Sequence, residues 1–204
     1  IAMSDWSSDV CSSDLGFPVQ AFEKELAFHC APALAGIKAA NLICCAKEDY
    51  DSFEELIAQY NAQLNRCGIC FEILSQCSKK HLLLVYRPKL LERHVSLPVC
   101  RQILSAAGYP AAAPLPSLLK HLKGRLTNCE EFPHEIGVFL GYPPEDVIGF
   151  QLHRGKGYKL CGYWKVYSNP ELAEKAFRCY DRCRSALYRR VSSGYTLTKL
   201  FLAA

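Results

Sequence analysis

The sequence predicts an α/β protein with one layered domain, in which a mixed sheet of about four strands is flanked by six or seven helices. Segments with an apolar stripe at helical spacing alternate along the chain with short apolar runs typical of strands. Half of the residues are hydrophobic, and about 190 residues follow the N-terminal segment 1–15, enough to bury a sizeable core. We therefore expect a single domain over residues 16–191, followed by a C-terminal tail at 192–204.

Each predicted element has its own signal. The helical segments are residues 22–29, residues 51–64, a short helix that begins at Pro88, residues 98–107, a helix capped by Ser117, and a long final helix with Asn169 as N-cap and Pro170 as its first residue. The strand-like segments are residues 36–45, 68–74, 81–86 and 157–167. The run HLLLVY at 81–86 is almost wholly apolar, which predicts a central strand.

The first fifteen residues do not read like part of this domain. Residues 5–15 resemble the translation of a common short-read sequencing adapter, and a genuine polar tail is the alternative. In either case the Ser/Asp-rich composition predicts disorder. Without this segment, 24 basic residues face 17 acidic ones and the formal net charge rises from +4 to +7.

The twelve cysteines favour a reducing compartment. Cys44, Cys45, Cys70, Cys100 and Cys161 lie in apolar runs, where a free thiol behaves as a small hydrophobic group. Extracellular disulfide scaffolds are usually short and rich in loops, unlike this chain. The sequence also lacks an apolar run of the length that a membrane span needs. We therefore expect a cytoplasmic protein that does not enter a membrane.

Four motifs follow one another along the chain: HCAPALAGIKAANL at 29–42, PHE at 133–135, FLGYPPEDV at 139–147 and GYWKVY at 162–167. Over residues 22–183 the chain resembles the bacterial domain-of-unknown-function family numbered 3793. The resemblance implies a cytoplasmic protein of anaerobic Gram-positive bacteria with no established reaction. It supplies candidate positions and no mechanism.

Three cations suggest a binding site. Lys38, Arg87 and Lys165 each lie near a predicted strand edge or end, where a cation is costly unless it is paired or faces a ligand. Ion pairs with Glu72 or Glu135 are the alternative. We expect a small anionic ligand or a cofactor, of unknown identity, in a cleft where the segment around His134 meets the strand ends. The predicted binding residues are Lys38, Tyr86, Arg87, His134, Glu135, Tyr142 and Lys165, with Tyr163 as a further wall.

A cysteine-dependent enzyme is the second hypothesis. A thiol nucleophile needs a base, and the base needs an orienting acceptor, so Cys30, His134 and Glu135 could supply these three roles. The alternative makes Cys30 a packed thiol and Glu135 a carboxylate at a helix start. A third hypothesis is an accessory protein that acts through a protein partner, with a redox-linked or iron-linked role.

Other chemistries have weaker signals. Cys67 and Cys70 form a CxxC without a second cysteine or histidine pair at zinc spacing, and Cys179 and Cys183 lie one helical turn apart, so we predict no metal site. Six basic residues within 175–190 could follow a phosphate backbone. They are distributed around the predicted helix, without an aromatic platform, which disfavours a nucleic-acid partner.

Overall fold

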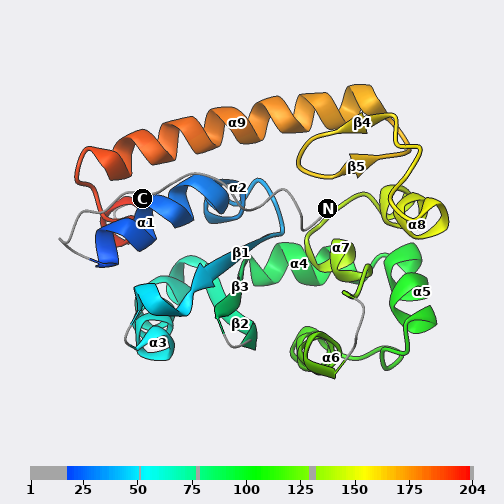
Figure 1. Ribbon diagram of the computed structural model, residues 1–204, viewed down its shortest axis with the longest axis horizontal. Helices are drawn as coiled ribbons and strands as arrows, with labels where there is room; N and C mark the ends of the chain where they lie inside the picture. The colour runs from blue at the N-terminus through cyan, green and yellow to red at the C-terminus, as the bar shows by residue number, and fades with distance from the viewer. Residues whose placement is uncertain (1–17, 51, 77–78, 129–131, 203–204) are drawn as a thin grey trace.

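Three strands form an antiparallel sheet in the computed structural model, which describes residues 18–50, 52–76, 79–128 and 132–202 (Figure 1). The strands are β1 (Ala40–Ala46), β2 (Cys70–Gln76) and β3 (Lys80–Tyr86), with the short β4 (Leu160–Cys161) and β5 (Lys165–Val166) elsewhere. The helices are α1 (Pro18–His29), α2 (Ala31–Leu34), α3 (Phe53–Leu64), α4 (Pro88–Val95), α5 (Pro98–Ala106), α6 (Leu115–Asn128), α7 (Ile136–Phe139), α8 (Pro144–His153), α9 (Pro170–Ser192) and α10 (Leu197–Leu202). The predicted α/β class is confirmed.

The sheet order is β1-β3-β2, so the apolar strand β3 is central, as its sequence predicts. Both pairings are antiparallel, and Tyr86 at the end of β3 lies opposite Ala40 of β1 and Cys70 of β2. β1 starts later than we expected because a turn at residues 35–36 and a bend at residues 37–39 precede it. Gly36 has a φ of 73° in this turn, a left-handed conformation that glycine adopts without a steric penalty.

We expected a single mixed sheet of about four strands, but the described residues form two separate sheets. Residues 157–167 fold into a separate two-stranded hairpin, in which Leu160 pairs with Val166 and Cys161 with Lys165. Gly162 starts the turn between the two strands. A Cβ atom there would lie 2.3 Å from a ring carbon of Phe177, so glycine lets α9 pack directly on the turn.

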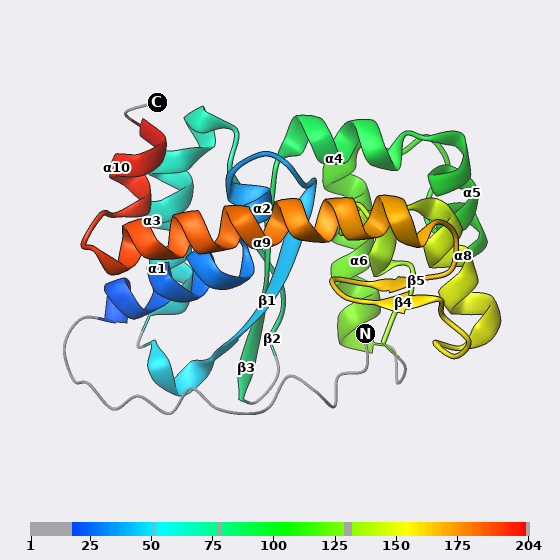
Figure 2. The ribbon, with the colours of Figure 1, turned by 90° about the horizontal axis from the view of Figure 1, so that it is seen from above.

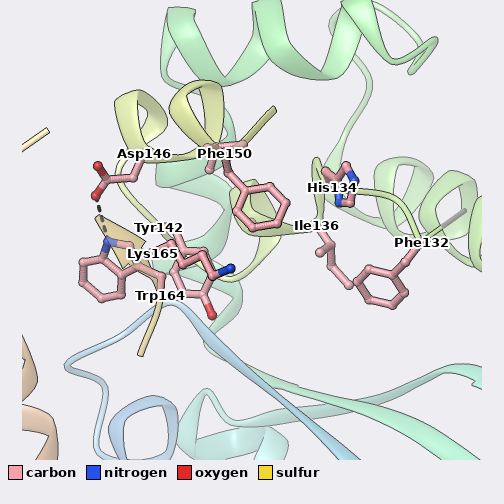
Figure 3. Close-up of a pocket in the computed structure, with 10 residues that line it drawn as sticks. Phe132, His134, Ile136, Tyr142, Asp146, Phe150, Trp164 and Lys165 are labelled. Carbon is pink, nitrogen blue, oxygen red and sulfur yellow. Dashed lines mark hydrogen bonds between the residues drawn. The ribbon is translucent and has the colours of Figure 1, made fainter. Parts of the chain in front are cut away.

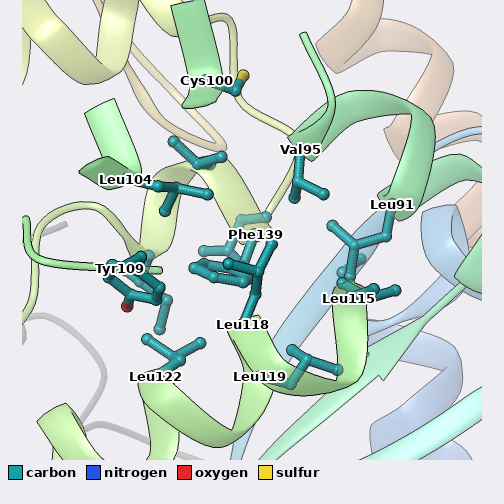
Figure 4. Packing of buried hydrophobic residues seen from close by; sticks show 14 of the residues in the cluster. Leu91, Val95, Cys100, Leu104, Tyr109, Leu115, Leu118, Leu119, Leu122 and Phe139 are labelled. Carbon is teal, nitrogen blue, oxygen red and sulfur yellow. The ribbon is translucent and has the colours of Figure 1, made fainter. Parts of the chain in front are cut away.

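The two faces of the three-stranded sheet pack against different helices. Ile43, Leu83 and Val85 face α1 and α3, whereas Leu84 points to the other face, as the two-residue period of a strand requires. The second face is covered by residues of α4, α5, α6, α7 and α8. Phe139 of α7 lies in the middle of this cluster, among leucines of the neighbouring helices (Figure 4). The segment from 132 to 150 is thus anchored on a fully buried core.

The long final helix predicted from Asn169 is confirmed as α9. The Asn169 side chain accepts a hydrogen bond from the backbone N–H of Leu172 at 3.1 Å, which is the expected N-cap. α9 runs across the molecule from the β4–β5 hairpin to α1 (Figure 2). Ala173 near its start packs with Trp164 of the hairpin, and Val191 near its end is buried in the α1–α3 core.

Part of the segment that we expected to be a tail, residues 197–202, is helical. This helix is α10, and its Leu197 is fully buried in the same core as α3. The thiol of Cys67 donates to the backbone oxygen of Phe201 at 3.2 Å, which also ties α10 to the domain. The helix is only six residues long, so its apolar residues form no clear helical pattern in the sequence. Residues 1–15, and with them the adapter prediction, lie outside the described residues.

Candidate functional site

A small pocket lies between the segment 132–137, helix α8 and the β4–β5 hairpin (Figure 3). Its volume is about 60 Å³. Most of its walls are aromatic or aliphatic, and His134, Asp146 and Lys165 add charged or titratable groups. The lining residues are Phe132, His134, Ile136, Gly137, Tyr142, Asp146, Val147, Phe150, Trp164 and Lys165. Three of the predicted binding residues, His134, Tyr142 and Lys165, therefore meet at one cavity.

Asp146 in the first turn of α8 holds the hairpin in place. Its Oδ2 accepts a hydrogen bond from Nε1 of Trp164 at 2.7 Å. Its Oδ1 accepts from the backbone N–H groups of Tyr167 and Ser168, each at 2.8 Å. Asp146 is 3% exposed, and a buried carboxylate needs hydrogen-bond donors. These three donors satisfy both of its oxygens. Asp146 thus fixes the orientation of Trp164 and, through the backbone, of the adjoining Lys165.

Tyr142 forms the wall between the pocket and the N-terminal half of the chain. Its hydroxyl donates to the backbone oxygen of Tyr163 at 3.1 Å, and its ring stacks on Trp164 with 5.3 Å between centroids. Gly137 permits this packing because a Cβ atom there would lie 2.9 Å from a methyl group of Val147 and 3.2 Å from the Tyr142 ring. Burial raises the pKa of Tyr142, so the phenol stays a neutral donor.

Lys165 and His134 supply the polar side of the pocket. Nζ of Lys165 donates to the backbone oxygen of Gly155 at 2.9 Å and lies 5.1 Å and 5.8 Å from the ring centroids of Tyr158 and Phe150. His134 is exposed and meets the Phe150 ring edge-on, at 5.0 Å between centroids. The ammonium points away from Asp146, toward the side where His134 lies (Figure 3). The Phe150 ring is thus shared by both polar groups.

Lys38 lies next to this pocket without lining it. Its Nζ is 4.9 Å from the centroid of the Tyr142 ring, and the residue is 5% exposed. Burial lowers the pKa of Lys38 to about 7, and the nearby Cys30 opposes part of this shift. Tyr86, by contrast, hydrogen-bonds with Cys70 at the end of the sheet, and burial raises its pKa. Tyr86 is not among the residues that line the pocket.

Arg87 does not reach the pocket, contrary to our expectation. Its Nε donates to the backbone oxygen of Ala33 at 3.0 Å. One terminal nitrogen donates to the backbone oxygen of Cys67 at 2.7 Å, and the other donates to the backbone oxygen of Leu34. The guanidinium therefore caps the C-terminal carbonyls of α2 and fastens the turn before β2. A planar fork with five donors suits this task, so the position is structural.

Glu135 also points away from the pocket. It is 4% exposed, and its Oε1 accepts hydrogen bonds from Nε of Arg125 at 2.5 Å and from the hydroxyl of Tyr109 at 3.2 Å. Arg125 belongs to α6, so the pair joins the start of α7 to that helix. His134 and Glu135 thus serve different environments although they are neighbours in sequence.

The environment of Cys30 disfavours a nucleophilic role. The residue is completely buried, and burial raises the pKa of its thiol far above the ordinary range, with Lys38 opposing and Glu25 reinforcing the shift. A reactive cysteine needs an accessible thiolate. Among the hydrogen bonds of the described residues, none joins the Cys30 side chain to His134 or Glu135. The Cys30 enzyme stays a prediction that this geometry does not support.

Asp146, Phe150 and Trp164 were missed as site residues, although Asp146 and Trp164 lie within two of the four motifs and Phe150 follows one of them by three positions. A signal existed for one pair. The indole N–H of a buried Trp needs an acceptor, and Asp146 with Glu145 is one of two adjacent carboxylates in a largely apolar stretch. Their side chains meet at 2.7 Å across 18 positions of sequence. The position of Phe150 depends on how α8 is rotated, which the sequence does not reveal.

Metal and membrane chemistry have no structural support in the part of the chain that is described. There, no three or more His, Cys, Asp or Glu side chains are grouped as metal ligands would be. Cys183 donates to the backbone oxygen of Ala31 at 3.4 Å, so it acts in packing between α9 and α2. Among the described helices, none combines the length and apolarity required for crossing a lipid bilayer.

Comparisons with known proteins agree with the motifs. Neither the curated proteins nor the solved structures contain a match to this chain. The sequence model of the family described as "Protein of unknown function (DUF3793)" matches residues 26–201. This range contains the three-stranded sheet, the hairpin, the pocket and nearly all of α10. The chain belongs to the DUF3793 family.

Proposed function

We propose that this protein binds a small organic anion in the pocket between the segment 132–137, α8 and the hairpin. The observation that carries the proposal is the position of Lys165. Its ammonium has three N–H donors, and among the described residues only Gly155 accepts a hydrogen bond from it. An anion would occupy the other donors, and the His134 ring lies on the same side of the cavity.

The surroundings of Lys165 favour a ligand over an internal ion pair. Asp146 is the nearby carboxylate in the lining, and three protein donors already use its oxygens. The salt bridges of the described residues do not include Lys165. A partly buried cation without a counterion attracts an anion more strongly than a solvated surface cation does.

Calorimetric titration tests the proposal. Acetate, phosphate, sulfate and nitrate would each be added to the wild-type protein and to the variants Lys165→Met and Lys159→Met. Lys159 is the matched control because it lies on the same hairpin and also donates to a carbonyl, that of Ser168, outside the pocket. We expect at least one anion to bind the wild type and Lys159→Met equally, and Lys165→Met at least tenfold more weakly. Equal binding by all three proteins, or no binding, would refute the site.

We also propose that the protein works in a reducing cytoplasm. The nine cysteines of the described residues are all free, and Cys30, Cys45 and Cys100 are buried as apolar groups. Thiol titration of the unfolded protein, isolated from its native host without reductant, should find every cysteine reactive. A deficit of two thiols would indicate a disulfide and an oxidising compartment.

A further inference from the structure

The size of the pocket limits its ligand. The volume of about 60 Å³ is far below the roughly 300–1,000 Å³ of a site for a drug-sized ligand. A cavity that holds one water molecule has a volume of roughly 10–15 Å³, so this space corresponds to about four to six waters. A nucleotide, a sugar phosphate or a flavin is therefore too large for the cavity to enclose. The part of the ligand that the cavity encloses has only a few non-hydrogen atoms.

The walls divide the pocket into an apolar part and a charged part. Ile136, Val147 and Phe150 present hydrocarbon, and Tyr142 and Trp164 present ring faces. The polar atoms of the two rings are already used, because the Tyr142 hydroxyl and the Trp164 indole both donate hydrogen bonds within the protein. The apolar part consequently offers nothing to a hydrated group, and it favours an alkyl chain.

The charged part has room for one monovalent group. Lys165 supplies an ammonium and His134 an imidazole, and Lys165 is the one Lys or Arg among the described lining residues, so the lining balances one negative charge. A phosphate dianion would exchange its hydration for a single cation, without the cluster of backbone N–H groups or arginines that phosphate sites use. A carboxylate has one charge and two oxygens, so one oxygen can accept from Lys165 while the other faces the side of the cavity where His134 lies.

We propose that the ligand is a short-chain monocarboxylate of about two to four carbon atoms, such as acetate, propionate or butyrate. The carboxylate lies between Lys165 and His134, and the alkyl chain lies against Ile136 and Val147. This assignment rests on the proposed anion site and adds the chemical class of its ligand. The chain length follows from the cavity volume, and the single charge follows from Lys165 as the one Lys or Arg among the described lining residues.

A chain-length series tests the assignment. Acetate, propionate, butyrate, hexanoate and octanoate would be titrated while the fluorescence of Trp164 is followed. The Trp6→Phe background makes Trp164 the single indole, since the chain has two tryptophans. We expect affinity to rise about fourfold with each added methylene up to butyrate, the factor for burying one methylene, and to fall at least tenfold for octanoate. Propionamide should bind at least tenfold more weakly than propionate.

Three variants keep the test informative. Lys165→Met should lose at least tenfold in propionate affinity, and Lys159→Met should lose nothing. Ile136→Val removes one methyl group from the wall, so the preferred chain should become one carbon longer. Thermal unfolding of each variant would verify that the domain is folded at the titration temperature.

The outcomes distinguish a failure of the monocarboxylate assignment from a failure of the anion site itself. Binding of phosphate or sulfate without binding of carboxylates would overturn the monocarboxylate and leave the anion site. Carboxylate binding that ignores chain length would also overturn it, because the alkyl chain would then lie outside the cavity. Absence of binding by every anion to the folded wild type would overturn both proposals.

Discussion

Arg87 and Lys165 lie in two regions that both place a cation beside a strand, yet the surroundings differ. Around Arg87, carbonyl oxygens of α2 and of Cys67 accept hydrogen bonds from three nitrogens of the guanidinium. Around Lys165, the carbonyl of Gly155 accepts one hydrogen bond from the ammonium, and the rings of Tyr158 and Phe150 lie nearby. A cation whose donors are saturated by backbone is part of the framework. A cation with donors to spare beside a cavity is available to a ligand.

The largest effect should come from removing the guanidinium. Arg87→Ala leaves carbonyls at the end of α2 and at Cys67 without their donor, so the free energy of unfolding should fall by about 3 kcal/mol. Urea denaturation would measure the loss. Arg87→Lys should recover only part of it, because one ammonium cannot reproduce the geometry of the planar fork. A loss below about 1 kcal/mol together with weaker anion binding would reverse the two roles.

The Lys165 region should be next in sensitivity, through the contact between α8 and the hairpin. A Cβ atom on Gly149 would lie 2.5 Å from Cγ of Tyr167, so Gly149→Ala forces the hairpin away from α8. We expect a loss of about 1–3 kcal/mol in the free energy of unfolding and weaker anion binding. Gly124→Ala is the matched control, since its new methyl group meets open space on α6. Equal stability of the two variants would show that the contact adjusts freely.

Lys38 connects the two regions and should make stability depend on pH. Its pKa in the folded protein is about 7, below the ordinary value near 10.5, so the unfolded chain binds the proton more tightly between these values. Its contribution to stability is therefore present above pH 10.5 and is lost as pH falls toward 7, by up to about 1.4 kcal/mol per pH unit.

The variant Lys38→Met isolates this effect. Unfolding free energies of wild type and variant, measured at pH 7, 8 and 9, should converge as the pH rises, with the variant favoured most at pH 7. Titrating groups elsewhere cancel in the difference. Parallel pH profiles of the two proteins would mean that burial does not disfavour the Lys38 ammonium.

Lys165→Met should have the smallest effect on stability. It removes one hydrogen bond and two ring contacts of a partly buried side chain, which corresponds to about 1 kcal/mol or less. Lys159→Met, which also loses one bond to a carbonyl, provides the reference in the same denaturation experiment. A cost equal to that of Arg87→Ala would make Lys165 a second framework cation and remove the argument for a ligand.

The sequence predicted the parts of the fold that depend on local patterns. The apolar run at 81–86 identified the central strand, and Asn169 with Pro170 identified the start of α9. The hairpin was missed because the turn that splits residues 157–167 into two strands depends on the packing of Phe177 against Gly162. This contact forms only in the folded protein. α10 was missed for a similar reason, since Leu197 gains its environment from α3.

The site was predictable only in part, because the partner of a charged residue is set by tertiary packing. Lys165 and Tyr142 were identified from their motifs, and both line the pocket. The partners of Arg87 lie 20 to 54 positions earlier in the chain, and nothing in their residue types marks them, since they are backbone carbonyls. Glu135 was assigned to the site, but Arg125 on α6 is its partner.

The length of α9 has a consequence for motion in the pocket. One end of the helix is packed into the core beneath α1, and the other end carries Ala173 and Phe177 against the hairpin that holds Lys165. Because a helix is stiff over this length, the hairpin cannot swing open alone while α9 keeps its place. Hydrogen exchange at the pocket should therefore follow the protection of α1, and a substitution under the far end of α9 should alter ligand exchange at the near end.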